Sequence, residues 1–197
     1  MEVVSEYKYL GQIVSMNDGQ AKENHARISA SWRSFWALKH LFKSEMSNYH
    51  KRKLMDWCVL PVLTYGAQTW SLTKAQEHQL AVAQRAMERS MLKIRLQDRI
   101  RNEEIRKTTK IKDVVEKIKE LKWSWAGHLA RREDCRWSHL VINWIPENGF
   151  RSRGRPRTRW HDEIKEFAGD DWSNQAQDRE KWKKMGLSFV QQWTVID

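Results

Sequence analysis

Five arginines alternate with other residues towards the C-terminal end of the chain. The run contains no acidic residue and consists of Arg151, Arg153, Arg155, Arg157 and Arg159. Pro156 lacks a backbone donor and disfavours helix at the preceding residue, and Gly154 weakens any regular element, so we predict an extended segment. An extended segment cannot bury its own charge. A polyanion is therefore the natural ligand, and nucleic acid is the commonest one.

Three interpretations of the arginine segment are open from the sequence. The segment could be a general phosphate-binding arm, whose binding would weaken steeply with salt because each neutralised phosphate releases counterions. Arg153-Gly154-Arg155-Pro156 also resembles the core of an AT-hook, an extended peptide that lies in the narrow minor groove of A·T-rich DNA. Alternatively, the arginines form a solvated loop that pairs with acids further along, at Asp162, Glu163 and Glu166.

Positive charge is not confined to this segment. The 197 residues carry a formal net charge of +11, and both halves of the chain are basic. We predict that four further arginines extend the cationic surface, namely Arg85, Arg89, Arg131 and Arg132. The expected partners are RNA, DNA or both, and no membrane partner is expected.

Catalytic chemistry has little support among the acidic, histidine and cysteine residues. Nucleotidyl transfer needs clustered carboxylates that hold divalent metal, yet Asp170-Asp171 directly follows a predicted helix end and suits a solvated turn. His128, Cys135 and His139 lack the tighter, paired spacing typical of zinc sites. The chain has no phosphate-binding loop, dinucleotide motif or nucleophile elbow. We therefore expect no catalytic residues, no metal and no cofactor.

Composition indicates the cellular compartment and the residues that form the core. Only two cysteines are present, which makes a disulfide framework unexpected and suits a reducing compartment. No secretory signal opens the chain and no run of 18 apolar residues occurs, so we expect an intracellular protein, nuclear or cytoplasmic. There are 12 tryptophans, and we expect most of them to be core residues of small helical units.

Hydrophobic periodicity predicts a mainly α protein. Residues 7–15 alternate as a strand does, and the turn residues 17–19 follow, so a short N-terminal β-hairpin is predicted. Helical spacing then begins at about residue 20 and continues to residue 42. A second helix is predicted over residues 47–60, with Trp57 among its inward residues and Pro61 ending or kinking it.

Capping residues predict where the later helices begin. Thr73 is a suitable N-cap with Gln76 three residues on, as in a capping box, and the helix should continue to about residue 94. Asp113 opens a longer helix that extends to about residue 132, with Leu121 and Trp125 on its apolar face. Ser173 is the expected cap of the last helix.

Several ordered motifs resemble the region that follows the catalytic palm in reverse transcriptases of non-LTR retrotransposons, in particular RTE-like elements. The motifs are Tyr9-Leu10-Gly11, Leu60-Pro61-Val62-Leu63-Thr64-Tyr65-Gly66-Ala67-Gln68-Thr69-Trp70, Gln84-Arg85-Ala86-Met87-Glu88-Arg89, Asp98-Arg99-Ile100-Arg101-Asn102, Leu121-Lys122-Trp123-Ser124-Trp125-Ala126-Gly127-His128 and Gly154-Arg155-Pro156-Arg157-Thr158-Arg159-Trp160. The resemblance covers nearly the whole chain.

The resemblance implies three regions. Residues 1–19 would be the end of a palm-like β-hairpin, 20–100 a helical thumb-like bundle, and 101–197 a smaller basic, Trp-rich helical unit with an arginine arm at 151–159. The endonuclease, the fingers and the aromatic-x-Asp-Asp motif of the palm are missing from the sequence. The expected function is thus to hold RNA template or target DNA without catalysis, possible partners being the palm and fingers of a parent enzyme. The alternative is a protein-interaction module or an inactive retroelement remnant.

Overall fold

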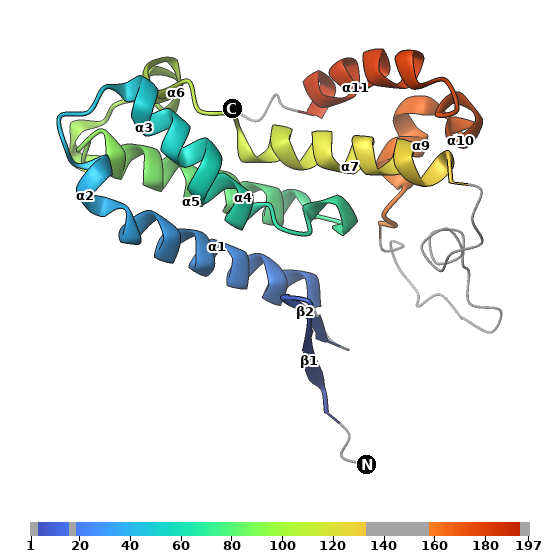
Figure 1. Ribbon diagram of the computed structural model, residues 1–197, viewed down its shortest axis with the longest axis horizontal. Helices are drawn as coiled ribbons and strands as arrows, with labels where there is room; N and C mark the ends of the chain where they lie inside the picture. Colours follow the sequence, from blue (N-terminus) through green and yellow to red (C-terminus); the bar gives the residue numbers. More distant parts are fainter. Residues whose placement is uncertain (1–3, 16–18, 133–157, 194–197) are drawn as a thin grey trace. The chain divides into compact units, whose positions relative to one another are not determined.

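The protein is mainly helical in its computed structural model, which describes residues 4–15, 19–132 and 158–193 (Figure 1). Strands β1 (Glu6–Tyr9) and β2 (Gln12–Ser15) form an antiparallel hairpin that precedes the helices. The longer helices are α1 (Gly19–Ala37), α3 (Asn48–Leu54), α5 (Lys74–Met91), α6 (Asn102–Thr109), α7 (Val114–Ala130), α9 (Asp162–Ala168) and α11 (Arg179–Trp193). Shorter ones are α2 (Lys39–Phe42), the π-helix η1 (Met55–Val59), α4 (Leu60–Leu63), η2 (Ala67–Thr69), η3 (Leu96–Asp98) and α10 (Trp172–Gln175). The predicted fold class is confirmed. None of the helices in the described ranges is both long and apolar enough to cross a bilayer.

The chain divides into two compact units. Unit 1 comprises Met1–Gly66 and Leu72–Lys117, and unit 2 comprises Ala67–Ser71 and Ile118–Asp197. The division falls within α7, whereas the sequence suggested a boundary between residues 100 and 101. The physical reason is that α6 packs against α3 and α5, so the residues just after position 100 belong to unit 1.

The core of unit 1 is formed by aromatic and aliphatic side chains from α1, α2, η1 and α5. Phe35 and Phe42 stack with their ring centroids 4.5 Å apart, and Met87 and Met91 of α5 are buried in the same cluster. Thr73 caps α5, because its hydroxyl accepts from the backbone of Gln76 while the Gln76 side chain accepts from the backbone of Thr73. The predicted capping box is thus confirmed.

A π-helical turn explains why the second predicted helix differs from expectation. The backbone N–H of Leu60 donates to the carbonyl of Met55, five residues back, and Pro61 lies in the first turn of α4, which continues to Leu63. Pro61 therefore does not end the helix. The wider turn changes which side chains face inward, and Trp57 is 70% exposed rather than buried. The prediction of an inward Trp57 was wrong.

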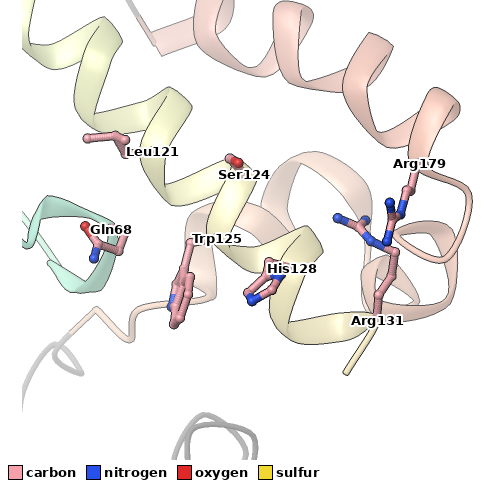
Figure 2. A pocket seen from close by; sticks show the side chains of 7 residues that line it. All are labelled: Gln68, Leu121, Ser124, Trp125, His128, Arg131 and Arg179. Carbon is pink, nitrogen blue, oxygen red and sulfur yellow. The ribbon is translucent and has the colours of Figure 1, made fainter. Parts of the chain in front are cut away.

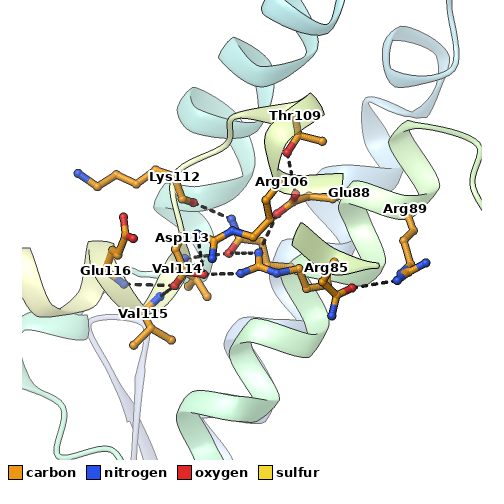
Figure 3. A network of polar contacts seen from close by, with 12 residues as sticks. Arg85, Glu88, Arg89, Arg106, Thr109, Lys112, Asp113, Val114, Val115 and Glu116 are labelled. Carbon is orange, nitrogen blue, oxygen red and sulfur yellow. Dashed lines mark hydrogen bonds and ion pairs between the residues drawn. The ribbon is translucent and has the colours of Figure 1, made fainter. Parts of the chain in front are cut away.

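Polar contacts join the start of α7 to α5 within unit 1 (Figure 3). The buried amide of Gln84 donates to the carbonyl of Lys112 at 2.7 Å and accepts from the backbone of Val114 at 2.8 Å. One oxygen of Asp113 accepts from the backbones of Val115 and Glu116, which makes Asp113 the cap of α7. These contacts satisfy backbone groups that the helix end would otherwise leave unpaired.

A buried carboxylate, Glu88, belongs to the same network. Its two oxygens accept from Arg85 at 2.9 Å and from the hydroxyl of Thr109 at 2.8 Å. Burial raises the pKa of Glu88 above its ordinary value, although the charge of Arg85 and the Thr109 hydrogen bond oppose that shift. The Arg85 guanidinium therefore compensates a buried acid.

Two tryptophans interlock at the centre of unit 2. Trp123 of α7 and Trp182 of α11 stack with ring centroids 3.9 Å apart and an interplanar angle of 10°. The indole N–H of Trp123 donates to the carbonyl of Trp182, and that of Trp182 donates to the carbonyl of Trp123. The Trp182 ring lies over Gly127, and the Trp123 ring lies over Gly186, so each ring covers the glycine four residues after its partner. The pair therefore fixes α7 and α11 to each other through stacking, hydrogen bonds and close backbone approach.

A second buried feature of unit 2 is an ion-pair cluster. Glu163 of α9 accepts from the ammonium groups of Lys119 at 2.7 Å and Lys122 at 2.9 Å, and both lysines are almost completely buried. Burial alone would raise the pKa of Glu163, but the charges of Lys122 and Lys119 outweigh it and hold the pKa below its ordinary value. The cluster joins α7 to α9.

The last helix begins later than predicted. Ser173 lies within α10, and α11 starts at Arg179. The side chain of Asp178 accepts from the backbone N–H of Lys181 at 3.0 Å, so Asp178 is the cap of α11.

Candidate nucleic-acid interface

The predicted arginine arm lies mostly outside the described residues. Nothing is described for Arg151, Arg153, Arg155 and Arg157. Arg159 is partly exposed, and its backbone N–H donates to the carboxylate of Asp162 at 2.6 Å. Glu163, one of the acids that could have paired with the run, already accepts from two buried lysines through its two oxygens. Glu163 is thus already paired within unit 2, and the three interpretations of the arginine run stay predictions.

The two predicted arginines of α5 are held by contacts within unit 1. Arg85 contacts the carboxylates of both Glu88 and Asp113. One guanidinium nitrogen of Arg89 donates to the carbonyl of Ile100 and to the side chain of Asn102, at 2.9 Å each. These contacts fix the positions of both guanidinium groups. Their role towards nucleic acid stays a prediction.

A pocket of about 530 Å³ in unit 2 brings one of the predicted arginines together with residues that the sequence did not single out (Figure 2). The lining residues are Gln68, Leu121, Ser124, Trp125, His128, Arg131 and Arg179. Two of these described lining residues are arginines and none is an acid. The other predicted residue nearby in sequence, Arg132, is partly exposed and follows Arg131 in the chain.

One wall of the pocket is a face of helix α7. Leu121, Ser124, Trp125 and His128 recur at spacings of three and four, so they lie on one face of the helix. Arg131 follows three residues later, just past the end of the helix. Leu121 and Trp125 were predicted on the apolar face of this helix, and both are only partly buried. The polar residues Ser124 and His128 at the same spacing were the available signal that this face is open to solvent.

Arg131 and Arg179 place two positive charges next to each other at one end of the pocket (Figure 2). A guanidinium nitrogen of Arg131 donates to the carbonyl of Ala176 at 2.6 Å, which fixes the side chain. Burial, and secondly the charge of Arg179, lower the pKa of Arg131 from its ordinary value. Like charges held together in this way favour an anion, because an anion between them offsets their repulsion.

Two of the α7 side chains that line the pocket are aromatic. The rings of Trp125 and His128 lie with centroids 5.4 Å apart and are tilted by 36°. An indole face that is partly open to solvent can stack on a nucleobase, and guanidinium groups bind phosphate oxygens in a bidentate manner. The pocket therefore combines a stacking surface with a phosphate-binding pair.

The acidic and metal-ligating residues of the sequence do not assemble in the part of the chain that the structure describes. Asp170 and Asp171 are exposed in the turn between α9 and α10, and Asp170 contacts Lys165 at 3.2 Å. Within the described ranges, no three histidine, cysteine or acidic side chains come together as metal ligands. Of the candidate zinc ligands, Cys135 and His139 lie outside those ranges.

One comparison with known proteins identifies the family. The chain is 35% identical over 195 residues to an uncharacterised protein of Caenorhabditis elegans named as transposon-derived, and the match covers 92% of this chain and 70% of that protein. No family model matches the chain, and no solved structure matches it. The chain therefore belongs to the same family of transposon-derived proteins.

Proposed function

We propose that this protein is a nucleic-acid-binding, non-catalytic region of a non-LTR retrotransposon reverse transcriptase, and that it holds RNA template or target DNA. The transposon-derived relative supports the origin. The observation that carries the binding function is the pocket of unit 2, where Arg131 and Arg179 lie together without an acidic residue among the described lining residues.

Charge and chemistry point to the same ligand. The net charge of +11 attracts a polyanion over distance, and the paired guanidinium groups bind single phosphates at contact. Trp125 adds a face for an unpaired base. The arginine arm, with Arg159 at its described end, would contribute further phosphate contacts.

Removal of the pocket arginines should reduce the salt dependence of binding. Each lost phosphate contact lowers the slope of log affinity against log salt by about 0.7–0.9, so Arg179→Gln should lower it by about that amount. Replacing the five arginines of the arm with serine should lower the slope further. The measurement is fluorescence anisotropy of labelled RNA and DNA at several salt concentrations.

Lys184→Gln is the matched control, because Lys184 is an exposed cation of α11 that does not line the pocket. Its slope should lie close to that of the wild type. A flat salt dependence of the wild-type protein, or unchanged binding in both arginine variants, would contradict the proposal.

A protein-interaction role has one observation in its favour. The β1–β2 hairpin exposes Tyr7, Tyr9 and Val14, each by more than half, and Tyr7 lies directly opposite Val14. Exposed apolar residues gathered on a hairpin are suited to packing against another polypeptide. If this role dominates, purified protein should self-associate in light scattering, and Tyr7→Ser together with Tyr9→Ser should restore a monomer. A clean wild-type monomer would argue against it.

A further inference from the structure

The continuous helical stretch of α3 and η1 exposes two aromatic side chains with a lysine between them. Tyr49 is 58% exposed and Trp57 is 70% exposed. The ammonium nitrogen of Lys53 lies 5.3 Å from the centroid of the Trp57 ring and 5.7 Å from that of the Tyr49 ring. We call these three residues the aromatic–lysine stripe. They recur every four residues, so the stripe follows the helix surface.

The charge around the stripe is positive. Helix α3 contains Lys51, Arg52 and Lys53 and no acidic residue. The next acid in sequence is Asp56, a partly buried residue whose pKa is raised by burial, against the opposing charges of nearby basic residues. Another exposed indole of unit 1, Trp36, has the ammonium groups of Lys39 and Lys43 at 5.5 and 6.0 Å from its ring. Exposed rings next to cations are thus a repeated feature of this unit.

An exposed Trp ring is a large apolar surface, and the π-helical turn holds it outward. A single strand of nucleic acid is a suitable ligand for this surface. A base can stack on each exposed ring, and a phosphate can approach the lysine between them. A duplex keeps its bases stacked on each other, so it cannot use the rings in this way. Stacking of this kind is therefore open to the unpaired bases of a single strand and closed to those of a duplex.

We propose that the aromatic–lysine stripe, Tyr49, Lys53 and Trp57, binds single-stranded nucleic acid by stacking unpaired bases on its two rings. The inference rests on the proposed function, because it names the form of nucleic acid that unit 1 would take. It uses none of the residues of the unit 2 pocket. The two sites can therefore be tested separately.

The test compares a labelled single strand of about 15 nucleotides with a blunt duplex of the same length, by anisotropy with the full chain. Trp57→Ala should weaken single-strand binding by about five-fold or more, because one base–aromatic stack is lost. Duplex binding should change by less than about two-fold, and Trp57→Phe should largely restore single-strand binding. Tyr49→Ala should act in the same direction as Trp57→Ala.

Val82→Ala is the matched control, because it truncates another exposed apolar side chain of unit 1. It should leave both affinities unchanged, and thermal unfolding should verify that every variant is folded.

Equal losses for single strand and duplex, or unchanged single-strand binding in Trp57→Ala, would overturn the inference while the proposed function stood. Loss of self-association in Trp57→Ala with unchanged binding would assign the stripe to a protein partner instead. A wild-type protein that binds neither probe would overturn both.

Discussion

Replacing Glu163 with glutamine is expected to lower the free energy of unfolding of unit 2 by about 3–5 kcal/mol. The carboxylate faces the buried ammonium groups of Lys119 and Lys122, at 2.7 and 2.9 Å. Glutamine has nearly the same shape, but it carries no charge and presents an NH2 group to one of the two ammonium groups. The variant thus removes the counter-charge and leaves the packing almost unchanged. Urea unfolding and hydrogen exchange of the α7 and α9 amides would measure the effect.

The same ion-pair cluster predicts a dependence on pH. The folded-state pKa of Glu163 lies below its unfolded value, so its contribution to stability is complete above the unfolded pKa of about 4.3 and is lost as pH falls through the folded pKa. Glu163→Gln should therefore remove part of the acid destabilisation seen in the wild type. Glu166→Gln is the control, because Glu166 is an exposed acid of the same helix. Equal stabilities of Glu163→Gln and the wild type at neutral pH would refute the argument.

Gly127→Ala should destabilise unit 2 by up to about 3 kcal/mol, although alanine is the better helix former. A Cβ at position 127 would lie only 2.4 Å from the indole nitrogen of Trp182. The indole cannot readily move away, because it stacks on Trp123 and donates to the Trp123 carbonyl. The clash therefore has to be relieved by separation of α7 from α11. Gly186→Ala should act similarly, since its Cβ would lie 2.7 Å from Trp123.

Ser124→Ala provides the comparison for this prediction. Ser124 is exposed on the same helix, so alanine there gains helix propensity and meets no obstacle. Faster hydrogen exchange in α7 and α11 should appear in Gly127→Ala and be absent in Ser124→Ala. If Gly127→Ala instead raised the stability, as alanine does at an open helix position, the close approach of the two helices would be disproved.

Local sequence signals were sufficient where the determining residues are neighbours in the chain. The capping box of Thr73 and Gln76 depends on two residues three apart, and the structure contains it. An N-terminal hairpin was also predicted, but alternation indicated one strand over residues 7–15. The hairpin turns inside that stretch, at Leu10 and Gly11, which both have positive φ. Positions 121, 124, 125 and 128 share a face for the same local reason, but periodicity could not tell whether that face is buried or lines a pocket.

The structure decided what these signals left open, partly through local backbone geometry and partly through contacts between distant residues. Asp178 rather than Ser173 caps the last helix, because a separate short helix, α10, intervenes. Trp57 turned outward because of the π-helical turn next to Pro61, which hydrophobic spacing alone does not reveal. Arg179 belongs to the candidate site because α11 places it beside Arg131, a residue 48 positions earlier in the sequence.

The sequence by itself determined that this protein is basic, mainly helical and rich in tryptophan, because these properties depend on composition and on contacts within a few residues. Tertiary structure alone decided which cationic side chains compensate buried acids and which lie next to another cation. Arg85 faces Glu88 and Asp113, whereas Arg131 has Arg179 beside it in the pocket. The difference arises from electrostatics, because the state of a charge depends on the groups that folding brings to it and on how much water it keeps.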